Sequence, residues 1–140
     1  MSYNNALLLL GSNLGNPIEN LEKAISAIES CCGTVVKRSK LLKTKPVEFG
    51  SNNYFCNIAM SINTHCSPVQ LLSVLKRIER NMGREQDSSD LGGYHDRIID
   101  IDIVKFNGIS FRSEKLEIPH KKHLFERDFS KELIKDINEH

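Results

Sequence analysis

Hydrophobic residues open the chain in a pattern that predicts a buried strand followed by an amphipathic helix. Residues 6–10, "ALLLL", are uniformly apolar and end at Gly11, as in a central strand covered on both faces. Asn16 is a good helix N-cap, Pro17 suits the first helical position, and Glu19 completes an arrangement similar to a capping box. The apolar positions of this helix share one face: Ile18, Leu21, Ile25 and Ile28.

Two further strands and a second helix are predicted in the middle of the chain. Residues 35–43 favour a strand with a basic exposed side, and residues 54–62 form a strand that alternates between two faces. One face carries Tyr54, Cys56, Ile58, Met60 and Ile62, and the other carries Phe55, Asn57, Ala59 and Ser61. Ser67 and Pro68 open a second helix whose apolar stripe is Leu71, Leu75, Ile78 and Met82.

The last strand and its turn complete a recognisable order of elements. Residues 98–106 predict a strand, and Asn107-Gly108 predicts a hairpin that returns through residues 109–111. The order is then β-α-β-β-α-β, followed by a C-terminal hairpin and a short helix. It indicates an α+β fold, a ferredoxin-like sandwich whose antiparallel sheet has its helices mainly on one face. The other face is left partly uncovered, where a site can lie.

Length and charge narrow the class of protein. With 140 residues we expect a single domain, 1–140. The formal net charge is +1, which gives no broad field for nucleic acid or an anionic membrane. The apolar run near the N-terminus is too short to span a bilayer and lacks the pattern of a signal peptide. We therefore expect a cytoplasmic monomer whose partners are small molecules.

The cysteines favour neither a disulfide framework nor a zinc site. There are four, and none is spaced as C-x-x-C. They are Cys31, Cys32, Cys56 and Cys66. We interpret them as small buried apolar residues of a protein in a reducing compartment.

The stretch "RIIDIDIV", residues 97–104, combines a core strand with two acidic residues. Asp100 and Asp102 share one face of the strand, while the alternating isoleucines, Ile99, Ile101 and Ile103, point to the core. They can be ordinary strand carboxylates that face water or pair with Arg97. Alternatively, two carboxylates with the same orientation suit Mg²⁺, which prefers oxygen ligands, and can hold two ions for phosphoryl transfer. A divalent ion also removes the repulsion between them.

Other residues in the same region suit phosphate and a planar ring. Arg84 and Arg97 bracket a long polar segment and can bind phosphate bidentately. His120 follows a proline and has cationic neighbours, so a phosphate contact is one interpretation and a structural histidine another. Phe55 and Asn57 share a strand face, which suits a heteroaromatic ligand stacked on the ring and bound by the carboxamide. Phe129 offers a second stacking surface.

Taken together, the motifs resemble those of the 6-hydroxymethyl-7,8-dihydropterin pyrophosphokinase family. The blocks follow the family's order over nearly the whole chain: "LLLLGSNLGNP", "LLKTKPV", "YFCNIAMSI", "LLSVLKRIERNMGRE", "YHDRIIDIDIVKFNG", "LEIPH" and "ERDF". The most specific part is "DRIIDIDI" followed by "IPH". The resemblance implies the ferredoxin-like fold and transfer of the β,γ-diphosphate of ATP to the pterin hydroxymethyl group, with release of AMP.

The same resemblance implies roles for individual residues. It makes Asp100 and Asp102 the ligands of two Mg²⁺ ions, and it makes Asp100 our only candidate for a general base. It places one group of residues on ATP: Arg84, Arg97, His120 and Arg127. It places a second group on the pterin: Thr44, Val47, Phe55, Asn57 and Phe129. The segment after Arg84 matches a loop that closes over both substrates.

This chain departs from the family pattern at three places. Glu85-Gln86 stands where many relatives carry a second arginine, and Tyr94-His95-Asp96 where others have Trp-Gly-Pro, so we expect Tyr94 to act as the aromatic residue of the loop at the pterin. The segment "PHKKHLFERDF" is one residue longer than the usual spacing, and the chain stops soon after Phe129.

Two other functions stay open on the sequence alone. One is a different two-metal phosphotransferase or nucleotidyltransferase that uses the same aspartates with another acceptor. The other is a ferredoxin-like small-molecule sensor domain, which would leave the aspartate pair unexplained. Formation of AMP from ATP, Mg²⁺ and the pterin separates the three.

Overall fold

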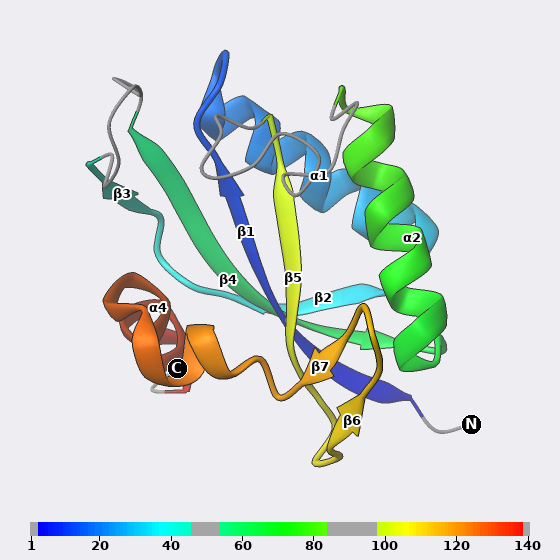
Figure 1. Ribbon diagram of the computed structural model, residues 1–140. Coiled ribbons are helices and arrows are strands. Elements are labelled where there is room, and N and C mark those ends of the chain that lie inside the picture. The colour runs from blue at the N-terminus through cyan, green and yellow to red at the C-terminus, as the bar shows by residue number, and fades with distance from the viewer. Residues whose placement is uncertain (1–2, 46–53, 84–97, 139–140) are drawn as a thin grey trace.

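An antiparallel sheet forms the centre of the molecule in a computed structural model, which describes residues 3–45, 54–83 and 98–138 (Figure 1). The strands are β1 (Asn4–Ser12), β2 (Thr34–Arg38), β3 (Leu42–Thr44), β4 (Phe55–Thr64), β5 (Asp100–Phe106), β6 (Phe111–Arg112) and β7 (Glu117–Ile118). The helices are α1 (Pro17–Cys31), α2 (Pro68–Asn81), the short π-helix η1 (Lys122–Glu126) and α4 (Asp128–Asn138).

The predicted topology is confirmed for the main sheet. Its strands run in the order β2-β4-β1-β5, with β3 also paired to β4, and every pair is antiparallel. Helices α1 and α2 pack on one face of this sheet (Figure 1). The N-caps predicted at Asn16 and Ser67 are present, and only Ser67 forms the full capping box with Gln70.

The prediction of one continuous strand at residues 35–43 is wrong. The segment breaks into β2 and β3 around the buried Ser39. The Ser39 hydroxyl accepts a hydrogen bond from the Ala59 N–H at 2.8 Å, and the Ser39 N–H donates to the Ala59 carbonyl at 2.9 Å. Because this side chain takes the place of a backbone acceptor, the regular ladder stops there and resumes at Leu42.

The hairpin predicted from residues 98–106 to 109–111 is also wrong. Asn107 does make a turn, with a positive φ of 51°, but its backbone and carboxamide both bind Asn5 at the start of β1. The chain therefore leaves the sheet, and β6 pairs with β7 in a separate two-stranded hairpin.

Two apolar clusters cover the two faces of the sheet. The larger lies between the sheet and helices α1 and α2, and includes Leu8, Leu10 and Met60. The smaller lies under α4 and joins Leu7, Leu9, Ala59 and Val104 to Leu133, Ile134 and Ile137. Helix α4 thus covers part of the face that was predicted to be open. Ile18, predicted on the apolar stripe of α1, is 54% exposed, and Ala24 lies in the core with the other predicted positions.

All four cysteines are free thiols, but they are not all buried. Cys32 and Cys56 are buried, whereas Cys31 is exposed and Cys66 is half-buried. Burial raises the pKa of the Cys32 thiol to about 12, which makes that thiol a poor nucleophile. Within the described residues, no helix is both long enough and apolar enough to cross a membrane.

Candidate active site

Strand β5 places the two aspartates as the sequence predicts. Ile99, Ile101 and Ile103 are buried in the cluster under α1 and α2, so the alternating positions, Asp100 and Asp102, belong to the opposite face. Both aspartates are half-buried. On this edge strand the Ile101 N–H donates to the Glu79 carboxylate of α2 at 2.7 Å, which holds the strand against the helix.

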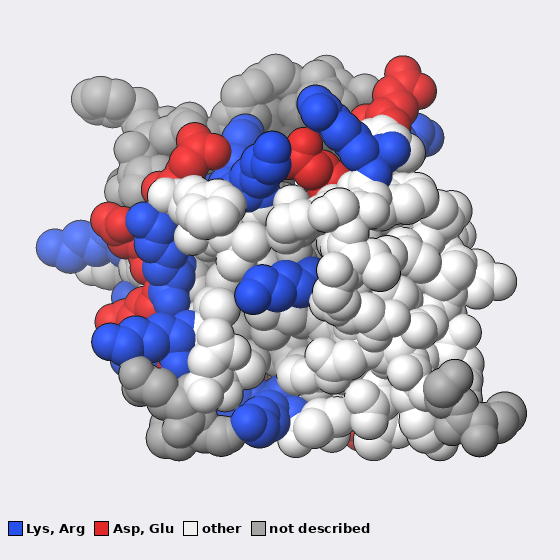
Figure 2. All heavy atoms as spheres, turned by 90° about the horizontal axis from the view of Figure 1, so that it is seen from below, with Lys and Arg blue, Asp and Glu red and all other residues white. Residues whose placement is uncertain are grey.

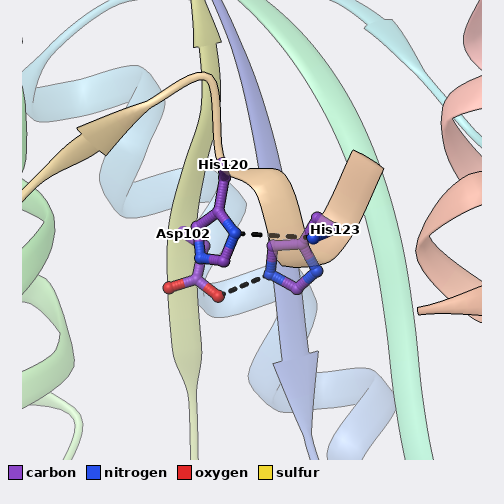
Figure 3. A group of neighbouring side chains, drawn as sticks. All are labelled: Asp102, His120 and His123. Carbon is purple, nitrogen blue, oxygen red and sulfur yellow. Dashed lines mark hydrogen bonds and ion pairs between the residues drawn. The ribbon is translucent and has the colours of Figure 1, made fainter. Parts of the chain in front are cut away.

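Asp102 accepts a hydrogen bond from a histidine that the sequence interpretation did not use. The Oδ2 atom of Asp102 lies 2.7 Å from Nε2 of His123 (Figure 3). Nδ1 of the same ring lies 2.6 Å from the Ser130 hydroxyl. His123 is 2% exposed and Ser130 is fully buried. A chain of three polar groups therefore runs from α4 through η1 to β5.

The surroundings of Asp102 favour its carboxylate form. Burial alone would raise the pKa of this carboxyl, but the hydrogen bond from His123 and the charges of His123, His120 and Arg127 outweigh it. The pKa of Asp102 is therefore lowered. Its ionised oxygens are the type of ligand that Mg²⁺ prefers.

His120 lies beside this pair at the end of a tight connection. The Ile118-Pro119 peptide bond before it is cis, and its own N–H donates to the Val104 carbonyl at 2.8 Å. Its ring is 4.2 Å from that of His123, tilted by 35°. Burial and the neighbouring His123 lower the pKa of His120, which favours the neutral imidazole.

Arg127, one of the four residues predicted to contact ATP, lies beside His123. Its Nη1 atom lies 3.3 Å from Nε2 of His123, close enough for its charge to act on Asp102. The structure therefore brings Asp102, His120 and Arg127 together, as the resemblance implies. Among the described residues, ligand atoms of Asp102, His120 and His123 all lie within 4.8 Å of one another.

A pocket of about 370 Å³ opens beside this cluster, between α2, β5 and the β6–β7 hairpin. Asp102 and His120 line it together with a group of lysines: Lys76, Lys115, Lys121 and Lys122. The acidic side chains in its wall, Asp102 and Glu117, are outnumbered by the basic ones. Such a pocket suits a polyanion.

The charges elsewhere do not form one continuous basic surface in the view from below. Along the left edge of that view, basic side chains are interspersed with acidic ones, and a wide uncharged area lies beside them (Figure 2). At the pocket, by contrast, four lysines face two acidic side chains.

Three of the residues predicted to bind a planar ring lie on the strands β3 and β4, across the sheet from Asp100. Thr44 and Phe55 are direct partners across β3 and β4, and Asn57 lies two positions further along β4. Gly11 of β1 pairs with Asn57 on one side and with Asp100 on the other. Two strand spacings, about 10 Å, therefore separate Asn57 from Asp100 on one face of the sheet.

Phe129 lies on the His123 side of the site. It is the second residue of α4 and packs edge-on against His123, with ring centroids 6.2 Å apart. Its other neighbours belong to the apolar cluster under α4. Four predicted site residues lie outside the described part of the chain: Val47, Arg84, Tyr94 and Arg97. The predicted closing loop after Arg84 lies there as well.

His123 could have been found from the sequence by its spacing from His120. The two are three residues apart in "PHKKH", which puts them on the same side of a helical turn. What the spacing does not give is the contact with Ser130 and Asp102, which depends on how η1 and α4 fold back onto the sheet.

The fold has counterparts among solved structures. The crystal structure of Plasmodium falciparum HPPK-DHPS wild type with pteroate superimposes with a TM-score of 0.74 at 19% identity, over 97% of this chain and 39% of that one. The likeness shows a shared fold, and it confirms the ferredoxin-like α+β sandwich.

The sequence comparisons then define the family. The family described as 7,8-dihydro-6-hydroxymethylpterin-pyrophosphokinase (HPPK) matches residues 7–139. The 2-amino-4-hydroxy-6-hydroxymethyldihydropteridine pyrophosphokinase of Porphyromonas gingivalis is 34% identical over 131 residues, which cover 93% of this chain and 88% of that protein. The enzyme of the same name from Haemophilus influenzae is 35% identical, over 82% of this chain and 70% of its own. The chain belongs to the HPPK family, which transfers pyrophosphate to hydroxymethyldihydropterin in folate synthesis.

Proposed function

We propose that this chain transfers the β,γ-diphosphate of ATP to the hydroxymethyl group of 6-hydroxymethyl-7,8-dihydropterin and releases AMP. In this proposal Asp100 and Asp102 hold two Mg²⁺ ions, and the loop that follows Arg84 closes over the substrates. The chain acts as a single domain, 1–140, and as a cytoplasmic monomer. The proposal rests on family membership and on the way the described residues surround Asp102.

The lysine-lined pocket is the observation that carries the ATP side of the proposal. It joins Asp102 and His120 to the four lysines in one cavity. A triphosphate in this cavity would exchange its hydration for charge-assisted hydrogen bonds from the lysines, with its reacting end beside Asp102. Arg127 would add a further positive charge from the other side of the cluster. The predicted roles of Arg84 and Arg97 at the phosphates belong to the same proposal.

Asp102 fits a metal ion in the way the proposal requires. Its Oδ2 atom is held by His123, while its second carboxylate oxygen points away from that ring (Figure 3). Asp100 adds a second carboxylate at the next position on the same strand face. Bound Mg²⁺ would neutralise the phosphate charge and polarise the β-phosphorus for attack.

The other end of the sheet face would hold the acceptor. A pterin ring beside Phe55 and Asn57 can stack on the phenyl group and bind the carboxamide. The spacing of about 10 Å between Asn57 and Asp100 lets the hydroxymethyl group extend toward the phosphates. Thr44, Val47, Tyr94 and Phe129 complete the pterin side of the proposal. Positioning two substrates in line is the main way in which a phosphoryl-transfer site accelerates its reaction.

The nature of the nucleotide product tests this function. Incubation of the protein with ATP, Mg²⁺ and 6-hydroxymethyl-7,8-dihydropterin is expected to yield AMP and the pterin diphosphate in equal amounts, measured by chromatography. ADP in place of AMP would show transfer of a single phosphoryl group. AMP formation that needs another acceptor would point to a different transferase, and tight pterin binding without turnover would point to a sensor domain.

Gly11 gives a second test, on the pterin side. A Cβ atom built at Gly11 would lie 2.6 Å from Oδ1 of Asn57, which is too close for either residue to stay in place. Gly11→Ala is therefore expected to turn the Asn57 carboxamide away, to cost about 1–3 kcal/mol of stability, and to weaken pterin binding more than ATP binding. Calorimetric titration with each substrate measures both affinities.

Gly108→Ala is the matched control for this substitution. It makes the same chemical change in a turn where a Cβ atom meets nothing within 4 Å. Its pterin affinity should equal that of the unmodified protein. Equal pterin affinity in Gly11→Ala as well would remove Asn57 from the proposed pterin site.

A further inference from the structure

We propose that His123, held by Ser130, is a positioning residue that fixes the Asp102 carboxylate for metal binding. The inference rests on the proposed function, because it assumes that Asp102 ligates a metal ion. It adds a residue that the motif resemblance did not assign, and it concerns a group that does not itself touch the substrates or the metal.

The contacts of His123 are those of a residue that orients a ligand. Nε2 lies 2.7 Å from Oδ2 of Asp102 (Figure 3), and Nδ1 lies 2.6 Å from Oγ of Ser130. Both ring nitrogens are therefore engaged by protein groups. The ring is 2% exposed, and it contacts the tilted His120 ring and, in an edge arrangement, the Phe129 ring. With both nitrogens engaged and the ring buried, the imidazole is held in one orientation, which it imposes on Asp102.

The hydrogen between His123 and Asp102 belongs to the imidazole. A carboxylate beside Arg127 and two histidines is ionised, so Nε2–H donates and Oδ2 accepts. The bond fixes the rotation of the carboxylate group about its own axis. The other oxygen then points away from His123 (Figure 3). Without this bond the carboxylate could rotate, and a metal ion would have to order it on binding.

The same three side chains could instead be read as a metal centre with two histidine ligands. The geometry argues against that interpretation. The ligand atoms of the three side chains lie within 4.8 Å of one another, but both nitrogens of the His123 ring already contact protein groups. His123 could ligate a metal only after giving up its bond to Asp102 or to Ser130. Soft or borderline metals such as Co²⁺ or Zn²⁺, which favour imidazole, provide a test of this alternative.

Mn²⁺ binding measures the positioning role without relying on turnover. Free Mn²⁺ is counted by electron paramagnetic resonance in the presence of α,β-methylene ATP, in which the bond to be broken is replaced. His123→Leu is expected to weaken Mn²⁺ affinity by about 10-fold or more, the range seen when an outer partner of a metal ligand is lost. His123→Gln, whose amide can still donate to Asp102, is expected to restore most of that affinity.

Two further variants, Ser130→Ala and Thr64→Val, complete the Mn²⁺ binding measurement. Ser130→Ala removes the outer hydrogen bond alone, and a loss of about 3-fold is expected, which corresponds to one net hydrogen bond. It serves as the main variant if His123→Leu fails to fold. Thr64→Val is the matched control, because Thr64 is buried and hydrogen-bonded to Cys32 and Cys66 near the other end of β4. Its Mn²⁺ affinity should not change.

The outcomes separate this inference from the proposed function. Weaker Mn²⁺ binding in Asp102→Asn but unchanged binding in His123→Leu and Ser130→Ala would overturn the positioning role and leave the metal site in place. Unchanged binding in Asp102→Asn would overturn the metal site itself. Co²⁺ absorption bands that disappear in both His123→Leu and His123→Gln would make His123 a metal ligand, and would overturn the inference in favour of a two-histidine centre.

Discussion

Replacing Asp102 with asparagine is expected to lower kcat/KM for AMP formation by about 1,000-fold, while the protein stays folded. The change keeps the size of the side chain and an oxygen that can still accept the hydrogen bond from His123. It removes the negative charge that the site offers to Mg²⁺. Losing a charged metal ligand removes stabilisation of the phosphate charge in the transition state, and a 1,000-fold effect corresponds to about 4 kcal/mol.

The measurement is the rate of AMP formation at several Mg²⁺ concentrations, with circular dichroism as the check on folding. Asp100→Asn is expected to act in the same direction, because it is the second carboxylate of the pair. Glu114→Gln, which removes one carboxylate from an exposed position between β6 and β7, is the matched control and should keep full activity. If Asp102→Asn kept activity within tenfold of the unmodified protein, Asp102 would not be a metal ligand in the reaction.

High Mg²⁺ should partly restore Asp102→Asn. A site with one carboxylate binds the ion more weakly but can still be filled at a higher concentration. The loss of activity should therefore be largest at low Mg²⁺. Loss of folded structure in Asp102→Asn would instead show that the Asp102–His123 pair holds the fold together.

The sheet and its two helices could be predicted from the sequence because their signals are local. Alternating residues identify β4, the isoleucines of β5 identify its buried face, and Ser67 with Gln70 marks the start of α2. Each of these patterns is confined to a few consecutive residues, and each agrees with the final packing. The aspartates follow from the same alternation, because a strand with a buried isoleucine face must turn the residues between them to the other side.

The parts that were missed depend on contacts between distant segments. Ser39 breaks a strand because its hydroxyl binds the backbone of Ala59, twenty residues away. The predicted hairpin does not form at Asn107 because this residue binds Asn5, about a hundred residues away. In the sequence, His123 looks like a surface residue of a basic segment. In the structure, η1 and α4 place it between Ser130 and Asp102. None of these contacts leaves a periodic signal in the sequence.

Glu79 of α2 is a buried carboxylate that holds β5 against the helix, and its replacement is expected to have the second large effect, on stability. It lies on the helical stripe of α2, where Ile78 and Leu75 are apolar, yet it is itself only 1% exposed. Its carboxylate accepts the hydrogen bond from the Ile101 N–H at 2.7 Å and forms an ion pair with Lys76 at 3.4 Å. Because β5 is an edge strand, that N–H points away from β1 and depends on Glu79 for a partner.

Glu79→Ala is therefore expected to lower the free energy of unfolding by about 3 kcal/mol, from a buried N–H left without its acceptor and from the space left by the side chain. Urea unfolding followed by circular dichroism measures the change. Glu79→Gln keeps an acceptor for Ile101 and should lose less. Glu22→Ala is the control: it breaks the exposed ion pair between Glu22 of α1 and Arg38 of β2 and should cost less than about 1 kcal/mol. An equal loss in Glu79→Ala and Glu22→Ala would mean that β5, and the aspartates it carries, do not depend on this bond.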